Sequence, residues 1–324
     1  MQAAWMALGL VSVFGIAFLA TALARAYALR RRLLDQPGER RSHAVATARG
    51  GGIAIVVSQL LAYLGIGMAV PQAAPTLAVF SAGLVLVAGI GWWDDHRPLP
   101  AWPRLGVHVL AGALLGALVW YWTGDALKAG FIALLTVALI NIWNFMDGID
   151  GLAATQALLA ALAYALWLSP PFALPALLLA AGVLGFLPFN FPRARIFMGD
   201  VGSGALGYLL AGLVALGIAE GRVAWALWLM PLTAFCIDAG GTLLSRMLNG
   251  ERWMEAHTQH LYQLHVKRGL SHITLTCNYA VFSIVGITLA CAFARLSPAW
   301  GTGAAVAWST MGLGLWWVSR SSVR

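Results

Sequence analysis

Long apolar segments, separated by short polar stretches, run along nearly the whole chain. A helix needs about 20 apolar residues to cross a bilayer, and backbone within lipid must satisfy its own hydrogen bonds. Because the apolar runs are continuous and do not alternate, they predict helices and not barrel strands. We therefore expect an all-α polytopic membrane protein with eleven transmembrane helices, at residues 4–24, 51–70, 76–93, 105–122, 127–144, 152–168, 172–189, 203–219, 223–245, 272–294 and 299–319.

Composition supports the same class of protein. Of the 324 residues, 60% are hydrophobic and 10% charged, and the mean hydropathy is +0.80. Soluble domains carry about 25% charged residues, so a soluble enzyme, a disordered chain and a disulfide scaffold are excluded. Eleven spans of about 20 residues leave about 100 for loops and tails. We expect a single integral membrane domain over residues 1–324, with no large domain outside the bilayer.

The distribution of basic residues predicts the orientation. With the N-terminus outside, 17 of the 20 Lys and Arg lie on the inner side, and only Lys128, Arg222 and Arg295 lie outside. Cytoplasmic loops carry such an excess, so the C-terminus is expected to be cytoplasmic. The first segment lacks the positive amino end of a signal peptide, which favours an uncleaved span. Most acids also fall on the inner side, and this one-sided chemistry favours a reaction at the cytoplasmic membrane surface over transport.

Two aspartates close an apolar segment at the first cytoplasmic motif. Asp94 and Asp95 are adjacent, and like charges this close need a compensating cation. A divalent metal or a phosphate-bound Mg²⁺ is one compensation. The alternative is a solvated loop with Arg97 as the partner.

A second motif spans residues 141–151. It contains Asn144, Asp147 and Asp150, and a helical turn would place the two aspartates on one side. The glycines beside them allow a ligand to approach the backbone closely. These residues indicate a polar ligand; the alternative is an ordinary Asp-Gly turn between two helices.

A third motif spans residues 190–204. Arg193 and Arg195 precede Asp200, which opens a predicted helix whose N-terminus favours anions. A metal-binding acid, basic side chains and a helix N-terminus together would suit the binding of a phosphorylated substrate. The alternative is a positive-inside loop.

The longest loop, roughly 246–271, carries two histidines. His257 and His260 are three residues apart on a predicted amphipathic helix, where they could contact phosphate or act as acid and base. The alternative is a surface helix on the lipid headgroups. Asp238 lies within a predicted span and is either functional or paired with Arg246.

Taken together, these motifs indicate a phosphoryl-transfer chemistry. Phosphoryl transfer needs metal ions to neutralise charge and basic groups to hold oxygens. Five acids, two histidines and several arginines share one face of the predicted bundle. We interpret them as a site for Mg²⁺-assisted transfer of a phosphorylated group to or from a lipid.

The ordered motifs resemble those of the polyprenyl-phosphate N-acetylhexosamine-1-phosphate transferases. The resemblance covers about 35–290 and is carried by Arg49–Gly52, Asp94-Asp95, Asn144–Gly151, Phe197–Ser203 and His257-x-x-His260. It implies transfer of N-acetylhexosamine 1-phosphate from a UDP-sugar to undecaprenyl phosphate, releasing UMP. This reaction would start O-antigen or a related envelope glycan at the cytoplasmic face of a bacterial inner membrane. The resemblance further implies Mg²⁺, with Mn²⁺ as an alternative, a homodimer and no nucleic-acid partner.

Residue roles follow from the same resemblance. Asp200 resembles the principal Mg²⁺ ligand, and Asp94 and Asp95 the acidic pair that positions the metal and the lipid phosphate. The resemblance implies the nucleotide side for Asn144, Asp147 and Asp150. It implies a place near the diphosphate for Arg193, Arg195 and His260, of which His260 is also a catalytic candidate. His257 is implied as a substrate-binding residue, and Arg49 as part of a substrate-side loop.

The histidine motif departs from that of many relatives. Tyr262 and Gln263 stand where two further histidines would be. This pattern resembles the O-antigen-initiating subgroup, some of whose members take 6-deoxy sugars such as UDP-FucNAc or UDP-QuiNAc. The competing hypotheses are a transporter or flippase of a lipid-linked or anionic solute, and a non-catalytic assembly subunit.

Overall fold

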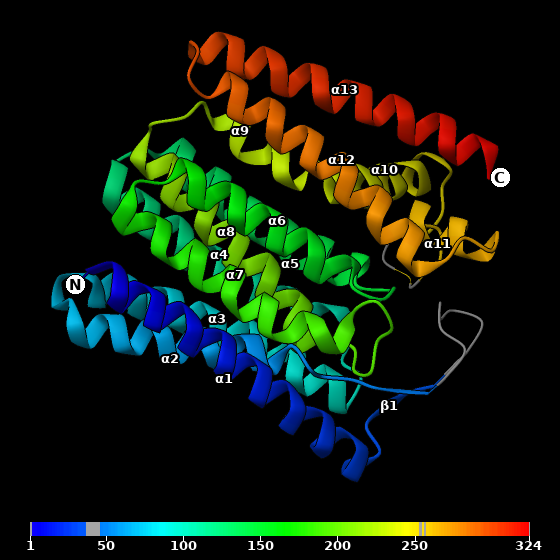
Figure 1. Ribbon diagram of the computed structural model, residues 1–324. Coiled ribbons are helices and arrows are strands. Elements are labelled where there is room, and N and C mark those ends of the chain that lie inside the picture. The colour runs from blue at the N-terminus through cyan, green and yellow to red at the C-terminus, as the bar shows by residue number, and fades with distance from the viewer. Residues whose placement is uncertain (1, 37–45, 253–254, 256, 324) are drawn as a thin grey trace.

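The computed structural model describes residues 2–36, 46–252, 255 and 257–323. Its helices lie side by side along roughly one direction, so that α1 begins at one end of the bundle and α13 ends at the other (Figure 1). The bounds of the main helices are α1 (Gln2–Arg31), α2 (Ile53–Ala69), α3 (Ala74–His96), α4 (Ala101–Thr123), α5 (Ala126–Met146), α6 (Leu152–Trp167), α7 (Pro170–Asn190), α8 (Asp200–Glu220), α9 (Trp225–Leu229), α10 (Thr233–Leu248), α11 (Leu261–Lys267), α12 (His272–Phe293) and α13 (Pro298–Ser322).

Every predicted apolar segment coincides with helical structure, so the all-α membrane fold is confirmed. The segment predicted at 223–245 is covered by α9, a 3₁₀ turn (Met230–Leu232) and α10. Among the described residues, eight helical stretches are long and apolar enough to cross a membrane, while α2 and α6 are apolar but shorter. The number of eleven spans and the cytoplasmic side stay predictions.

Helix α8 forms the centre of the bundle. Its residues 201–218 are all buried, and it packs mainly between α3 and α5. Small residues permit this close packing, as in other membrane bundles. A Cβ on Gly207, for example, would lie only 2.3 Å from the carbonyl oxygen of Leu139. The central position of α8 places Asp200, its first residue, where several helices end.

The tightest backbone approach is between Gly52, just before α2, and Gly202 in α8. A Cβ on Gly52 would lie 2.2 Å from the Cα of Gly202, so neither side can yield by rotating a side chain. We expect Gly52→Ala to lower the free energy of unfolding by about 1–3 kcal/mol. Gly65 on α2 has nothing within 4 Å of such a Cβ, which makes Gly65→Ala the matched control. Equal unfolding temperatures for the two variants would contradict this prediction.

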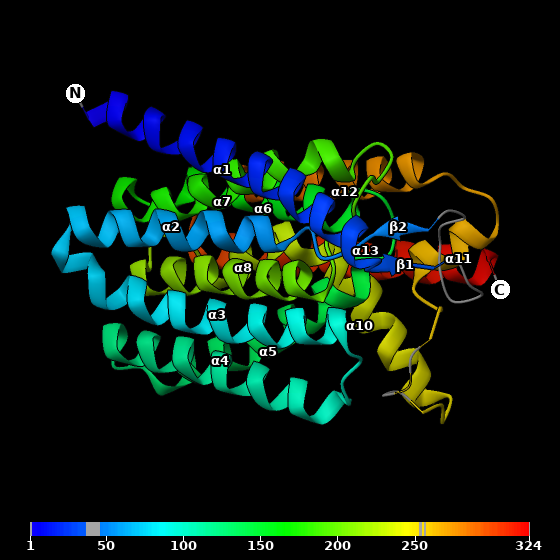
Figure 2. The same ribbon diagram turned by 90° about the horizontal axis from the view of Figure 1, so that it is seen from below.

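Short extended segments gather at the end of the bundle where α11 and the C-terminal end of α13 also lie (Figures 1 and 2). The strands β1 (Leu34–Asp35) and β2 (Thr47–Ala48) pair antiparallel. Next to them, the amides of Gly51 and Gly52 donate to the carbonyls of Phe197 and Met198 at 2.9 and 2.8 Å. These bonds hold the glycine-rich segment after Arg49 against the loop that leads into Asp200.

Candidate active site

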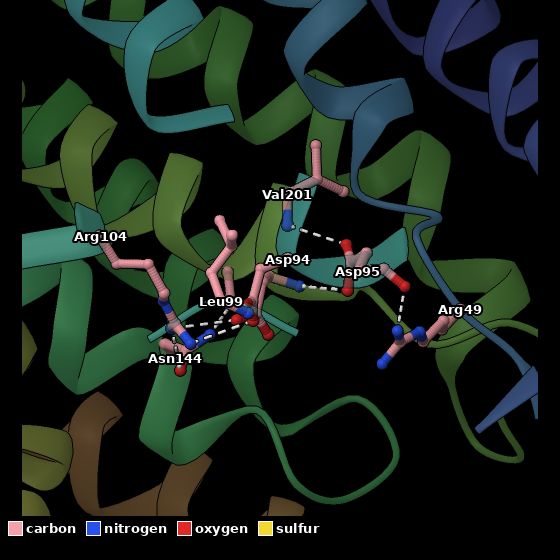
Figure 3. Close-up of polar contacts among 9 residues, drawn as sticks. Arg49, Asp94, Asp95, Leu99, Arg104, Asn144 and Val201 are labelled. Atoms are coloured by element: carbon pink, nitrogen blue, oxygen red, sulfur yellow. Dashed lines mark hydrogen bonds and ion pairs between the residues drawn. The ribbon is translucent and has the colours of Figure 1, made fainter. Parts of the chain in front are cut away.

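Asp94 and Asp95, in the last turn of α3, have different partners. Asp95 is only 4% exposed, and its two carboxylate oxygens accept the amides of Asp200 and Val201 at 3.1 Å each (Figure 3). An acid in this position also complements the positive end of the α8 dipole. Asp95 therefore holds the start of α8 in place.

Asp94 is bound to the segment that follows α3. Its carboxylate accepts the amide of Leu99 at 2.6 Å and pairs with Arg104 at 3.0 Å. The alternative that Asp94 belongs to a solvated loop with Arg97 as its partner is wrong, because the first turn of α4 brings Arg104 to it instead.

Arg104 is the main site residue that the sequence analysis missed. Its guanidinium contacts Asp94 and Asp200 at 3.0 Å each and donates to Asn144 at 3.4 Å (Figure 3). In the sequence, Arg104 contributes only to the positive-inside excess. Its place at the start of the helix after an acidic pair is the signal that could have identified it. Arg104 neutralises two acids that come from different helices.

Asn144 and Asp147 reach the same region from the end of α5. Asn144 donates to the hydroxyl of Ser203 at 3.2 Å. Asp147 follows the last helical residue, and its carboxylate has no hydrogen bond or ion pair with any residue that the structure describes. Burial, together with the negative charges of Asp200 and Asp95, raises the pKa of Asp147 well above its usual value. A cation bound there would reverse this effect.

These side chains surround a polar cavity of about 200 Å³, which we call the carboxylate cavity. Arg49 closes one edge and donates to the backbone carbonyl of Asp95. The lining residues come from six separate stretches of chain: Asp35, Arg49, Asp95, Asn144, Phe145, Asp147, Gly148, Phe197, Gly199, Asp200, Ser203, Tyr262 and Gln263. The fold thus brings Arg49, Asp95, Asn144, Asp147 and Asp200 together, as the sequence predicts.

Asp150 lies apart from this cavity. The expectation that a helical turn places it beside Asp147 is wrong, because α5 ends at Met146 and the chain turns through Gly151 with φ +73°. The carboxylate of Asp150 instead contacts His272 at 3.3 Å, and its carbonyl accepts from Thr276 at 2.9 Å. These bonds tie the loop to α12.

Arg193 and Arg195 are exposed in the loop between α7 and α8, and neither lines the carboxylate cavity. The guanidinium of Arg195 donates to the carbonyl of Pro188 at 2.6 Å and lies 4.9 Å from the ring centre of Phe189. The structure therefore places Arg195 against the end of α7, and the predicted contact of either arginine with a diphosphate gains no support from this arrangement.

The histidines also differ from the expectation. The predicted helix containing both is wrong: α11 begins at Leu261, His260 is its N-cap with extended backbone, and His257 lies in the preceding loop. Their ring centres are 4.8 Å apart. The helix begins there because the carboxylate of Asp238 accepts the amides of Leu261 and Tyr262.

The alternative pairing of Asp238 with Arg246 is also wrong. Arg246 contacts Glu251 at 3.0 Å, while the carboxylate of Asp238 is directed toward α11. The loop between α10 and α11 lies partly outside the described residues, at 253–254 and 256.

Comparison with known proteins decides the family. A sequence profile described as glycosyl transferase family 4 matches residues 77–218, which run from α3 to α8. The chain is 32% identical over 308 residues to the decaprenyl-phosphate N-acetylglucosaminephosphotransferase of Mycolicibacterium smegmatis, covering 79% of this chain and 74% of that protein. The chain belongs to the polyprenyl-phosphate N-acetylhexosamine-1-phosphate transferase family.

Two further relatives show how broad the similarity of this transferase is. It is 28% identical over 300 residues to a Bacillus subtilis protein named probable undecaprenyl-phosphate N-acetylglucosaminyl 1-phosphate transferase, covering 86% of the chain and 83% of the relative. It is 32% identical over 215 residues to the phospho-N-acetylmuramoyl-pentapeptide-transferase of Enterococcus faecalis, covering 58% and 66%. The resemblance drawn from the motifs is thereby confirmed, and a multi-pass bacterial membrane protein is supported.

The donor atoms of the carboxylate cavity suit a hard cation. No three His, Cys, Asp or Glu side chains among the described residues converge closely enough to enclose a metal ion. Mg²⁺ does not need such a cage, since it is usually bound by one or two carboxylates, water and substrate phosphates. Asp147 and Asp200 supply two carboxylates on the cavity wall, so the transferase has a donor set that fits this mode of binding.

Acidification is expected to destabilise the transferase in part through His257. Burial, followed by the charges of His260 and Arg246, lowers the pKa of His257 from 6.5 to about 4. Between these values the unfolded chain binds more protons than the native one, so stability present at neutral pH is lost as the pH falls. The fall in unfolding temperature from about pH 7.5 to 5 should be smaller in His257→Gln. An unchanged pH dependence in this variant would contradict the assignment.

Proposed function

We propose that this transferase moves N-acetylhexosamine 1-phosphate from a UDP-sugar to undecaprenyl phosphate, yielding undecaprenyl-diphospho-sugar and UMP. The observation that carries the proposal is the carboxylate cavity, where Asp147 and Asp200 face Arg49 at the end of an apolar bundle. Such a cavity offers acids for a metal and a cation for phosphate oxygens. The names of the relatives add a polyprenyl-phosphate acceptor.

The chemistry we propose is a direct displacement. An oxygen of the lipid phosphate attacks the β-phosphorus of the UDP-sugar, and the bond from that phosphorus to the bridging oxygen breaks as UMP leaves. Arg49 lines the cavity and is placed to hold phosphate oxygens and to orient the substrates. Arg104 is paired with Asp200 and positions its carboxylate. Mg²⁺, held by Asp200 and Asp147, would neutralise the charge that spreads over the phosphate oxygens.

Direct attack is favoured over a covalent intermediate on the acidic pair. Both oxygens of Asp95 already accept backbone amides, and Asp94 is bound by Leu99 and Arg104. Neither carboxylate is free to attack phosphorus without losing these bonds. The lipid phosphate, by contrast, is itself an oxyanion nucleophile.

The biological setting follows from the same proposal. The site would face the cytoplasm of a bacterial inner membrane, where UDP-sugars are present, and the product would start an O-antigen or related glycan. Tyr262 and Gln263 line the cavity where many relatives have histidines, and this subgroup resemblance is the basis for proposing a 6-deoxy sugar as one donor. The homodimer and the use of Mn²⁺ remain predictions from the family resemblance.

A UMP-release assay tests the proposal. Detergent-purified protein is incubated with undecaprenyl phosphate, Mg²⁺ and in turn UDP-GlcNAc, UDP-GalNAc, UDP-FucNAc and UDP-QuiNAc. We expect UMP only when the lipid is present, from at least one donor, and none after EDTA. UMP formed without the lipid would favour a covalent intermediate. If folded protein releases no UMP with any of the four donors, the proposal is contradicted.

A further inference from the structure

Asp238 is the centre of a buried hydrogen-bond cluster outside the carboxylate cavity. Its side chain lies in α10 and the residue is 2% exposed. One oxygen accepts the amide of Leu261 at 2.7 Å, the indole of Trp316 at 3.3 Å and a hydroxyl from Thr242 at 3.3 Å. The other accepts the amide of Tyr262 at 3.3 Å and the hydroxyl of Tyr279 at 2.7 Å. The carboxylate thus joins α10, α11, α12 and α13.

This cluster leads directly to the carboxylate cavity through Tyr262. The hydroxyl of Tyr262 donates to the carbonyl of Phe145 at 3.0 Å, in the last turn of α5. It also fills the space above Gly148, where a Cβ would lie 2.1 Å from the tyrosine oxygen. Tyr262 and its neighbour Gln263 line the cavity. The amide held by Asp238 therefore belongs to a residue that shapes the cavity wall.

Apolar packing holds only part of α11: Tyr262 is 1% exposed, but other residues of the helix face a cavity. A second cavity of about 320 Å³ lies between α10, α12 and α13 and is lined by Leu261 and His265 of α11. A helix that faces a cavity has fewer packing contacts to hold it. Hydrogen bonds to a charged, buried acceptor are the stronger kind. The two amides that Asp238 accepts are therefore a strong restraint on the start of α11, in addition to the capping box between His260 and Gln263.

A direct catalytic role for Asp238 is excluded by the same geometry. Five donors occupy its carboxylate, which leaves it without an open position for a metal or a phosphate. The residue does not line the carboxylate cavity. Its influence on a reaction must pass through the residues that it holds.

We infer that Asp238 is a positioning residue, which anchors the His260–Gln263 segment so that Tyr262 and Gln263 close the sugar-nucleotide side of the carboxylate cavity. The kinetic part of this inference rests on the proposed function, whereas the anchoring does not. Asp238→Asn is the informative variant. Either oxygen that becomes an NH₂ group then faces a backbone amide of α11, which can only donate, so one of the two anchoring bonds is lost.

Hydrogen exchange tests the anchoring without any assay of activity. In Asp238→Asn, peptides that contain Leu261–Gln263 should exchange faster than in the wild type, while peptides from the centre of α8 keep their protection. Ser283→Ala is the matched control, since it removes another buried bond of α12, to Gln156 at 2.5 Å. It should lower the unfolding temperature and leave α11 unchanged. Unaltered exchange at Leu261–Gln263 in Asp238→Asn would overturn the inference.

Kinetics then test the effect on the site. With the donor sugar nucleotide that the wild type uses, Asp238→Asn should lower kcat/KM by about 10-fold or more, as outer residues that orient ligands often do. KM for undecaprenyl phosphate should stay within about twofold, whereas a general loss of folded protein would lower kcat alone. Tyr262→Phe should lower kcat/KM for the same donor.

The double variant decides whether Asp238 acts through Tyr262. If it does, Asp238→Asn combined with Tyr262→Phe should lower kcat/KM by less than the product of the two single effects. Purely multiplicative effects would overturn the inference. If the wild type turns over no sugar nucleotide, the proposed function fails, and the exchange experiment alone decides the anchoring.

Discussion

Asp200→Asn is expected to lower the rate of UMP release by about a thousandfold. Asp200 begins α8, lines the carboxylate cavity and pairs with Arg104 at 3.0 Å. A bound metal supplies several kcal/mol of charge stabilisation to a phosphoryl transfer, and each 1.36 kcal/mol is tenfold in rate. Asparagine keeps the size of the side chain but removes the charge that holds the cation. The measurement is UMP release at saturating substrates over a series of Mg²⁺ concentrations.

Glu220→Gln provides the control for Asp200→Asn. Glu220 is the last residue of α8, at the opposite end from the cavity, and accepts the amide of Ser169 at 3.2 Å. The change removes one acid from the same helix without touching the site. We expect nearly full activity from it. Activity within a few fold of wild type in Asp200→Asn would show that the carboxylate is not the metal ligand.

Arg104→Met is expected to lower kcat/KM by about 100-fold and, at the same time, to reduce the Mg²⁺ concentration needed for half-maximal activity. Arg104 is bound to Asp94 and Asp200 at 3.0 Å each. Removing one preorganised charge from a phosphoryl-transfer site costs about 10²–10³ in rate. Removing the same charge frees Asp200 from a competing cation, so the metal should bind more tightly. Mg²⁺ titrations of UMP release measure both effects.

Arg97→Met is the matched control for Arg104→Met. Arg97 follows α3 as its C-cap, is exposed and lines neither of the cavities described above. Arg97→Met should leave both the rate of UMP release and the Mg²⁺ requirement unchanged. Arg104→Lys should recover only part of the activity, because an ammonium group cannot reach two carboxylates in the planar geometry of a guanidinium. A higher Mg²⁺ requirement in Arg104→Met would contradict the role of Arg104 as a counter-ion to Asp200.

The helices were largely predictable from the sequence because their signal is local. A continuous apolar run must form its own backbone hydrogen bonds in lipid, whatever its neighbours are. The ends were less predictable. Helix α1 continues to Arg31, beyond the expected end at 24, because alanine, leucine and arginine are good helix formers after the apolar run stops.

The candidate site was predictable where residue type alone indicates chemistry. The acids Asp95, Asp147 and Asp200, with Asn144, were identified from their motifs and do line one cavity. Arg49, which lines the same cavity, was identified only through the family resemblance. Arg104 was missed, since a basic residue at a helix start is ordinary until the acids that it contacts are known. Asp150 and Arg195 were misplaced because their directions depend on partners in other segments, such as His272 for Asp150.

The sequence by itself determined an all-α membrane bundle and the gathering of acids, amides and histidines in the loops that lead into its helices. Both follow from hydropathy and spacing, which act between near neighbours. Only the tertiary structure decided which of these residues meet: Arg104 between Asp94 and Asp200, and Asp238 under the start of α11. Helical periodicity fixes the face of its own helix on which each of these side chains lies. It does not fix which other helix packs against that face, so their partners are set by contacts between segments far apart in the chain.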